Sequence, residues 1–393
     1  MSVLMLLINP LLGVFTAVQS FSKNYASKWK VIIITAITFF FLGYSIQLTN
    51  MNADLARYFL WFPNYEDVTY NELISNAVST KNIFVIQQFM LAFFGQLQNN
   101  QIFTGFISAL FYSCYMYIIT TFLSQAPWKN YSITKKEIVI FFGIMLFSFG
   151  WVLMSVRNPM ANALIAVAIF KDLYLHQKKF STFLFYLLGI SMHVAVIPII
   201  ICRVVVGIFV SQSLRRRFFS AILAFLFVFI ALRSNILSEA SGKIDTYGIG
   251  STGGGFAQYA RTSIYYQVNG LFILLLMFLT LTLLFIIKSK KVMIDTTFCN
   301  FMFVVTILAI LSYFMPTPLI DRYGMFVELF IPLLIVCVPF NQLTKNTRLL
   351  YTTAFLSVGA FGTIWQILFL SYQIDISNFF LNILKGWTFL LSN

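Results

Sequence analysis

The sequence predicts an all-α, polytopic integral membrane protein that crosses a lipid bilayer about a dozen times. Of its 393 residues, 60% are hydrophobic and only 10% are charged, and the mean hydropathy is +0.86. A soluble domain is about a quarter charged. Apolar runs approaching the roughly 20 residues that a spanning helix needs recur along the whole chain. We therefore expect one integral membrane domain over residues 1–393, with no soluble appendage.

Short charged stretches separate the apolar runs and set the expected ends of the helices. The predicted spans are 1–19, 31–48, 101–124, 137–155, 159–176, 181–198, 199–213, 218–233, 264–287, 298–315, 321–340 and 349–371. The pair 181–198 and 199–213 is the weakest, because it is short for two full crossings. The first run has its lysines after the apolar core, whereas a secretory signal has them before it. We expect a retained first span whose C-terminal end lies inside.

The distribution of basic residues predicts the orientation. One set of connections holds 17 of the 26 basic residues against three acids, and the other holds eight basic residues and eight acids. The positive-inside rule makes the first set cytoplasmic. The net charge of +14 then follows from topology, and a nucleic-acid partner is not needed.

The apolar segment 82–97 is predicted not to cross the membrane. A crossing there would place Lys129, Lys135 and Lys136 outside. The segment is also short and interrupted by glutamines. We expect it to form, together with 68–80, interfacial or re-entrant helices on the outer face. That face would also carry the two long loops, 49–100 and 234–263.

Arginine dominates the basic residues of the predicted outer face, whereas the inner face has 13 Lys and four Arg. The guanidinium group is a permanently charged planar fork that suits phosphates. Interfacial snorkelling explains any single Arg equally well. The arginines expected to bind an anion are Arg57, Arg157, Arg261 and Arg322.

The segment Ser155-Val156-Arg157-Asn158-Pro159 predicts the start of a helix at the outer face. Pro159 fits its first position and Asn158 fits its cap. The free N–H groups and the positive end of the helix dipole would then lie beside Arg157 and bind an anion. The alternative is an ordinary helix start with an interfacial Arg.

A second pattern places Asp321, Gly324 and Glu328 on one stripe of a helix, next to Arg322. Glu328 would lie about 10 Å below Asp321. A carboxyl at that depth is costly and should have a partner or a function. Packing against a buried Arg is the structural alternative, and Gly324 leaves room for a ligand or a neighbouring helix.

Two further candidates are aromatic and imidazole groups. If residues 52–61 are helical, Asp54, Arg57, Tyr58 and Trp61 share a face. The rings could stack on sugars or simply belong to the aromatic belt at the membrane surface. His193, one of two histidines, could accept a proton from a hydroxyl near neutral pH, although a lone His in an apolar run is usually structural.

No pattern indicates a metal or a cofactor. The four cysteines, Cys114, Cys202, Cys299 and Cys337, are scattered in apolar runs without a Cys-x-x-Cys pair. The sequence Gly-Ile-Gly-Ser-Thr-Gly-Gly-Gly at 248–255 lacks the Lys-Ser/Thr of a phosphate-binding P-loop. We therefore expect no disulfide, no metal and no cofactor.

Four short motifs, taken in chain order, resemble the Wzy-type bacterial polysaccharide polymerases, in particular their EpsG-like branch. The motifs are Asp54-x-x-Arg57-Tyr58, Arg157 opening an alanine-rich helix, Ser191-Met192-His193 and Asp321-Arg322-Tyr323. The resemblance also covers the length and the number of spans.

The resemblance implies a GT-C-like, metal-independent glycosyltransferase in the bacterial cytoplasmic (inner) membrane. Such an enzyme joins oligosaccharide repeat units carried on undecaprenyl diphosphate for an O-antigen, a capsule or an exopolysaccharide. A chain-length regulator protein is an expected partner. Arg57, Arg157, His193 and Arg322 match the family pattern. Candidates for the base are His193, Asp321, Glu328 and Asp54.

Other classes stay open. An O-antigen ligase or another lipid-linked sugar transferase would differ mainly in its acceptor. A membrane acyltransferase would need access for an acyl donor from the cytoplasmic side. A lipid-linked oligosaccharide flippase should hold its charges in a central cavity and contain internal repeats, and no repeat is evident.

Overall fold

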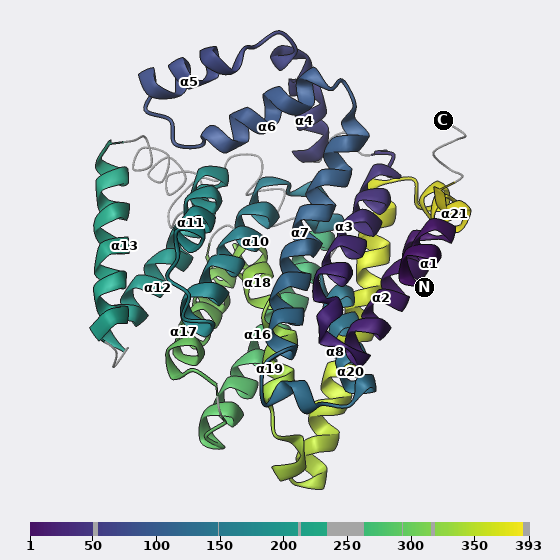
Figure 1. Cartoon of the computed structure of the whole chain (residues 1–393), viewed down its shortest axis with the longest axis vertical. Helices are drawn as coiled ribbons and strands as arrows, with labels where there is room; N and C mark the ends of the chain where they lie inside the picture. The colour runs from purple at the N-terminus through teal and green to yellow at the C-terminus, as the bar shows by residue number, and fades with distance from the viewer. Residues whose placement is uncertain are drawn as a thin grey trace. The chain divides into compact units, whose positions relative to one another are not determined.

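The computed structural model describes residues 1–49, 54–147, 149–210, 214–233, 263–292, 294–315 and 319–387. Within these ranges the chain is helical and has no strand (Figure 1). An isolated antiparallel bridge joins Leu48 to Ile374. The prediction of an all-α protein is therefore confirmed.

The length and hydrophobicity of the described helices indicate a membrane protein. Four of them could each cross a bilayer by length and composition: Asn100–Leu123 (α7), Ile264–Ser289 (α16), Thr296–Tyr313 (α17) and Lys345–Gln373 (α20). These four correspond to the predicted spans 101–124, 264–287, 298–315 and 349–371.

Some predicted spans are broken in the structure. The run 1–19 is divided into Ser2–Ile8 (α1) and Pro10–Lys23 (α2), and Asn9 between them has extended backbone. A residue that precedes proline disfavours the helical conformation, which explains this break. The run 321–340 is divided into Ile320–Glu328 (α18) and Ile331–Cys337 (α19), with a proline in the first turn of α19.

Three other predicted spans also differ from single straight helices. The run 137–155 becomes Ile133–Leu146 (α8) and Phe149–Met154 (α9), and α8 ends where Phe147 takes extended backbone. The run 159–176 becomes Arg157–Ile169 (α10) followed by a π-helical turn, Phe170–Tyr174 (η4). The run 181–198 becomes Phe180–Met192 (α11) and a short 3₁₀ turn, Val194–Val196 (η5).

Contacts divide the chain into two compact units. Unit 1 comprises residues 1–68, 90–163 and 359–393, and unit 2 comprises 69–89 and 164–358. The helices α6 (Val85–Gln96), α10 and α20 continue from one unit into the other. The expectation of one membrane domain over the whole chain stays a prediction.

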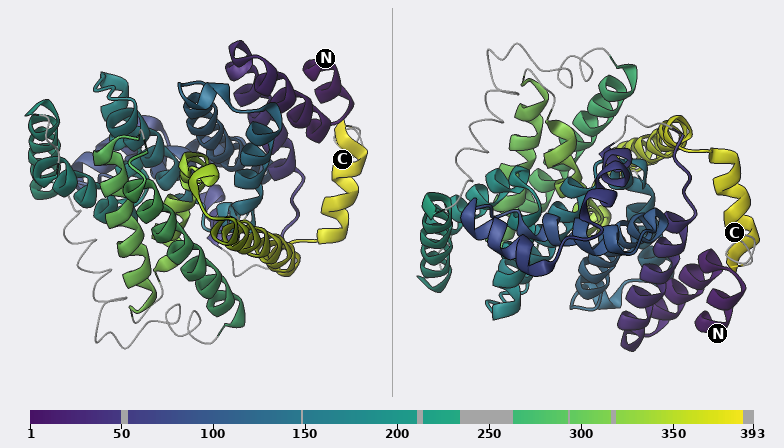
Figure 2. Two further views of the ribbon diagram at one scale, coloured as in Figure 1. Left: turned by 90° about the horizontal axis from the view of Figure 1, so that it is seen from below. Right: turned by 90° about the horizontal axis from the view of Figure 1, so that it is seen from above.

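Unit 1 is built on a close pair of helices, α3 (Lys28–Tyr44) and α7, with α2 packed beside α3 (Figures 1 and 2). The hydroxyl of Thr104 donates to the carbonyl of Gly43 at 2.7 Å. A Cβ at Gly43 would come within 2.4 Å of the Thr104 carbonyl oxygen, so only glycine fits. Small residues at such crossings let two apolar helices approach closely. Unit 1 also holds α4 (Asp54–Trp61) and α21 (Ile376–Lys385).

Unit 2 contains a packed group of three helices, α16, α17 and α18, and α17 also packs against α12 (Ile197–Phe209). The helix α13 (Leu214–Arg233) packs on α12. The short helix α5 (Tyr70–Ser79) begins with a capping box between Thr69 and Glu72. Both α5 and α6 are helical, as expected for 68–80 and 82–97, and their place at the membrane interface stays a prediction.

Candidate functional site

The helix that carries Arg157 begins earlier than expected. It starts at Arg157, so Pro159 is its third residue and Asn158 lies inside the first turn instead of capping it. Proline is tolerated there because the first N–H groups of a helix have no partner within the helix. The Asn158 side chain is buried, and its carbonyl oxygen accepts no hydrogen bond from any described residue. The prediction of an Asn158 cap is therefore wrong, and the prediction of a helix start beside Arg157 is confirmed.

The turn between α9 and α10 is strained. Val156 is buried and has φ of 37°, in the left-handed region that a β-branched residue rarely adopts. The turn is held by hydrogen bonds from Ser155 N to Trp151 O and from Met160 N to Val156 O. Strain of this kind costs about 1–3 kcal/mol and is concentrated at functional sites. It fixes the direction in which the chain enters α10 at Arg157.

The helix α4 brings three of the predicted residues together. Asp54 and Arg57 form an ion pair at 3.2 Å, and both side chains are about half exposed. Such a pair contributes about 0–1 kcal/mol, so Arg57 can exchange this partner for a ligand at little cost. Trp61 is 37% exposed, whereas Tyr58 is 1% exposed, with its ring packed against Phe103 and Trp61. The sugar-stacking roles stay predictions, and Trp61 has the more accessible ring.

Tyr58 connects α4 to Arg157. Burial raises the pKa of Tyr58, while the positive charge of Arg157 lowers it and the charge of Asp54 raises it. Arg157 and Asp54 therefore each lie within electrostatic range of Tyr58, and α4 packs on α9, the helix just before Arg157. The Tyr58 hydroxyl is buried and has no hydrogen-bond partner among the described residues. The buried side-chain oxygens of Tyr58 and Asn158, which have no hydrogen-bond partner among the described residues, thus lie on elements that also carry Arg57 and Arg157.

In unit 2, the helix α18 carries the predicted acidic stripe. The Asp321 carboxylate accepts a hydrogen bond from the Asn269 side chain at 2.9 Å, and Arg322 is half-buried beside it. A Cβ at Gly324 would lie 2.3 Å from a methyl group of Ile273 on α16. The sequence allowed either a ligand or a neighbouring helix beside Gly324. In the structure, the neighbouring helix α16 fills this space.

Glu328 ends the same stripe and is buried. Among the described residues, no Lys or Arg forms an ion pair with it. The structural alternative, packing against a buried Arg, is thus not found in the part of the chain that the structure describes. The negative charge of Asp321 acts unfavourably on a negative charge at Glu328. Two carboxyl groups on one face of α18 therefore stand without a basic partner within ion-pair distance.

His193 lies between α11 and η5. Its Nδ1 accepts a hydrogen bond from the backbone N–H of Ala195 at 2.9 Å, as the cap of the 3₁₀ turn. In the neutral ring the proton must then lie on Nε2. This geometry gives His193 a structural role as a helix cap. Its role as a base stays a prediction, and it would require the cap to open.

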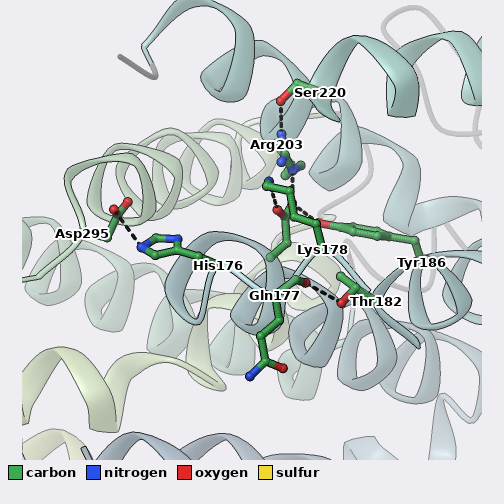
Figure 3. Close-up of polar contacts among 9 residues, drawn as sticks. His176, Gln177, Lys178, Thr182, Tyr186, Arg203, Ser220 and Asp295 are labelled. Atoms are coloured by element: carbon green, nitrogen blue, oxygen red, sulfur yellow. Dashed lines mark hydrogen bonds and ion pairs between the residues drawn. The ribbon is translucent and has the colours of Figure 1, made fainter. Parts of the chain in front are cut away.

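Sequence reasoning missed a buried charged cluster in unit 2 (Figure 3). Asp172, on the π-helical turn η4, is fully buried. It accepts hydrogen bonds from Lys178 at 2.6 Å, from the Tyr186 hydroxyl at 3.1 Å and from Arg203 Nε. Arg203, also fully buried, donates in addition to Ser220 on α13. The cluster joins the segments η4, α11, α12 and α13.

Two signals in the sequence could have found this cluster. Asp172 and Arg203 are each the only charge of their sign within a predicted span, and intramembrane charges are usually paired or functional. Their separation of 31 residues hid the pairing. The cluster holds two cations against one carboxylate, and Arg203 Nη2 has no hydrogen-bond partner among the described residues.

The predicted site residues fall into two sets. Unit 1 contains Asp54, Arg57, Tyr58, Trp61, Arg157 and Asn158, and unit 2 contains His193, Asp321, Arg322 and Glu328. Arg261 lies outside the described residues. The described part of the chain has no group of three or more His, Cys, Asp or Glu that could hold a metal ion. Comparison with models of protein families, with curated proteins and with solved structures gives no match for this chain.

Proposed function

We propose that this chain is a membrane glycosyltransferase that polymerises oligosaccharide repeat units carried on undecaprenyl diphosphate, at the outer face of the bacterial cytoplasmic membrane. The proposal includes about twelve spans and a GT-C-like arrangement. It rests on the resemblance of four motifs and on the surroundings of Arg157.

The observation that carries the proposal is the meeting of two motifs around Tyr58. Arg57 and Arg157 come from segments 100 residues apart, yet Arg157 and Asp54 both act on the Tyr58 hydroxyl. The strained Val156 turn and the N-terminus of α10 lie at the same place. Two guanidinium groups beside the positive end of a helix dipole suit a diphosphate, whose charge grows as it leaves.

The proposed reaction is a substitution at the anomeric carbon of the donor chain. The bond from this carbon to the diphosphate oxygen breaks, and the leaving diphosphate takes the electron pair. A hydroxyl oxygen of the next repeat unit forms the new glycosidic bond, and its proton passes to a base. The arginines would stabilise the leaving diphosphate, whose negative charge increases during this step.

The candidates for the base differ in their surroundings. Nδ1 of His193 is occupied by the Ala195 N–H, and Asp54 is paired with Arg57. Asp321 is half-buried and has one carboxylate oxygen held by Asn269, which leaves the other able to accept a proton. We therefore rank Asp321 before Glu328, His193 and Asp54.

One observation favours a second candidate function, a flippase. The cluster of Asp172, Lys178 and Arg203 is buried and carries one more positive than negative charge. Buried ionisable groups of this kind mark transport pathways in many membrane proteins. An O-antigen ligase or another lipid-linked sugar transferase would use the Arg157 region in the same way as a polymerase.

Deletion of the gene in its native host separates these functions by the surface polysaccharide seen on a gel. Loss of a polymerase leaves product with a single repeat unit. Loss of a flippase leaves no surface product, and loss of a ligase leaves polymer that stays on the lipid carrier. A wild-type ladder of chain lengths after deletion would refute the proposal.

Complementation of that deletion tests the proposed anion site. Arg157→Lys keeps the charge but loses the fork, so polymer should fall at least tenfold while the protein level in the membrane holds. The matched control is Arg348→Lys, at an exposed position near the start of α20 that the sequence places in the cytoplasm. Normal polymer from Arg157→Ala would remove Arg157 from the mechanism.

A further inference from the structure

A group of lysines in unit 1 lies over aromatic rings at one end of the α3–α7 pair. Residues 19–33 and 117–140 together contain six lysines and one carboxylate, Glu137. Among the described residues none of these lysines forms an ion pair. Within the described ranges this concentration of positive charge therefore has no carboxylate in ion-pair contact.

The cluster is built around Tyr25, in the turn before α3. The Tyr25 hydroxyl donates to the carbonyl of Lys129, and the ammonium of Lys136 donates to the same carbonyl at 3.0 Å. Lys136 Nζ lies 4.4 Å and Lys129 Nζ lies 5.8 Å from the centre of the Tyr25 ring. Lys136 is only 4% exposed, so this part of the cluster is fixed by packing.

Two more lysines extend the cluster along the ends of α3, α7 and α8. Lys28 donates to the Thr121 hydroxyl at 3.3 Å and lies over the rings of Trp29 and Tyr117. Lys135 lies over the ring of Tyr131, at 5.5 Å. Cation–π contacts hold each ammonium in place without neutralising its charge. We name Lys28, Lys129, Lys135 and Lys136 the lysine cluster.

An exposed apolar stripe begins at the lysine cluster and runs along α3. Trp29, Ile33 and Ile37 are exposed and spaced by four residues, so they share one face of the helix. Fixed cations beside an exposed apolar stripe match a molecule with an anionic head and an acyl tail. A soluble anion would use the cations and leave the stripe without a ligand.

We propose that the lysine cluster and the α3 stripe form a binding site for one anionic phospholipid of the bilayer. The headgroup phosphate lies among the ammonium groups of Lys28, Lys129 and Lys135, and an acyl chain lies along Trp29, Ile33 and Ile37. Basic residues at a membrane surface attract anionic lipid headgroups. The inference is independent of the catalytic proposal, because it uses none of the residues assigned to the reaction.

Native mass spectrometry of the purified full chain tests this site. The protein in detergent is titrated with phosphatidylglycerol or with phosphatidylcholine of the same acyl chains. We expect the first phosphatidylglycerol to bind at least tenfold more tightly. The test variant is Lys28→Gln/Lys129→Gln/Lys135→Gln, and it should lose this preference. The matched control is Lys288→Gln/Lys290→Gln/Lys291→Gln, and it should keep the preference. These exposed lysines lie in the last turn of α16 and just after it, and they contact no ring in the described part of the chain.

Two further arms keep the result decisive. Lys135→Gln alone changes one exposed lysine and serves if the triple variant does not fold; it should weaken phosphatidylglycerol binding about threefold. Inorganic phosphate and soluble glycerophosphoglycerol should not displace the lipid at millimolar concentration. Equal binding of the two lipids, equal losses in test and control variants, or full displacement by phosphate would each overturn the proposal.

Discussion

The buried cluster in unit 2 allows a prediction of stability that can be worked from the contacts. Asp172 is the only carboxylate in the cluster, and it accepts hydrogen bonds from Lys178, Tyr186 and Arg203. Asp172→Asn keeps the shape of the side chain and an acceptor oxygen, but it removes the charge. Arg203 is fully buried, so its charge would then have no counter-charge within the cluster. Removing one partner of a buried ion pair costs about 3–5 kcal/mol, which is the loss of unfolding free energy that we expect.

A second substitution should restore part of this loss. Arg203→Met removes the more deeply buried of the two charges that Asp172→Asn leaves unpaired, since the Arg203 side chain is 0% exposed and the Lys178 side chain is 7% exposed. The double variant Asp172→Asn/Arg203→Met should therefore be more stable than the sum of the two single losses, by a coupling of about 1–3 kcal/mol. The single amide oxygen can still accept from the Tyr186 hydroxyl, and Lys178 then loses its acceptor.

The assay is reversible unfolding of the purified protein in mixed micelles of dodecylmaltoside and sodium dodecyl sulfate, followed by tryptophan fluorescence. The matched control is Asp295→Asn. Asp295 pairs with His176 at 3.5 Å in a more exposed place, and it caps α17 through Thr297 and Phe298, a cap that Asn also provides. The control should lose less than about 1 kcal/mol. A loss for Asp172→Asn no larger than the control's, or an absence of coupling with Arg203→Met, would refute the reasoning.

Four other predictions follow from the two units. Gly324→Ala should lose about 1–3 kcal/mol by overpacking against Ile273, and Ile273→Ala in the same chain should recover most of it; a fully stable single variant would contradict the contact. Tyr58→Phe removes a buried hydroxyl with no described partner, so the unfolding temperature should hold, and a loss of polymerisation would then indicate contact with substrate. His193→Asn retains an acceptor for the cap and should polymerise purified repeat units at the wild-type rate from about pH 6 to 7; a missing rise of the rate in that range would make the imidazole the base. Cysteines at 99 and 129 should label from opposite sides of the membrane, with 99 outside, and labelling of both from the cytoplasm would reject the predicted topology.

The prediction of secondary structure succeeded where apolar runs were long and uninterrupted. The helices α7, α16, α17 and α20 lie where hydropathy alone placed them. It failed at Asn9 and near Glu328, where a local proline divides an apolar run that hydropathy treats as continuous. Hydropathy counts how apolar a window is and does not register a missing backbone donor or a clash at the preceding residue.

The candidate site was predicted as a set of residues, and only part of that set could be tested. The start of α10 near Arg157 and the helical stripe from Asp321 to Glu328 were foreseen. The cap by Asn158 was not borne out, because the helix begins at Arg157 and takes Asn158 into its first turn. The left-handed backbone at Val156 could not be foreseen, since a β-branched residue rarely adopts it.

By itself, the sequence determined that this protein is helical and lies in a membrane, because hydrophobicity and charge distribution are properties of composition and spacing. It also located the arginines and carboxylates at the ends of helices. Only the tertiary structure decided which of these groups meet. It pairs Asp172 with Arg203, which is 31 residues away in the sequence, and it makes His193 the acceptor of a backbone N–H group. It also placed Arg157 within electrostatic range of Tyr58 and filled the space at Gly324 with Ile273. The physical reason is that hydrogen bonds, ion pairs and close packing act over a few ångströms, and that proximity is created by folding and not by position along the chain.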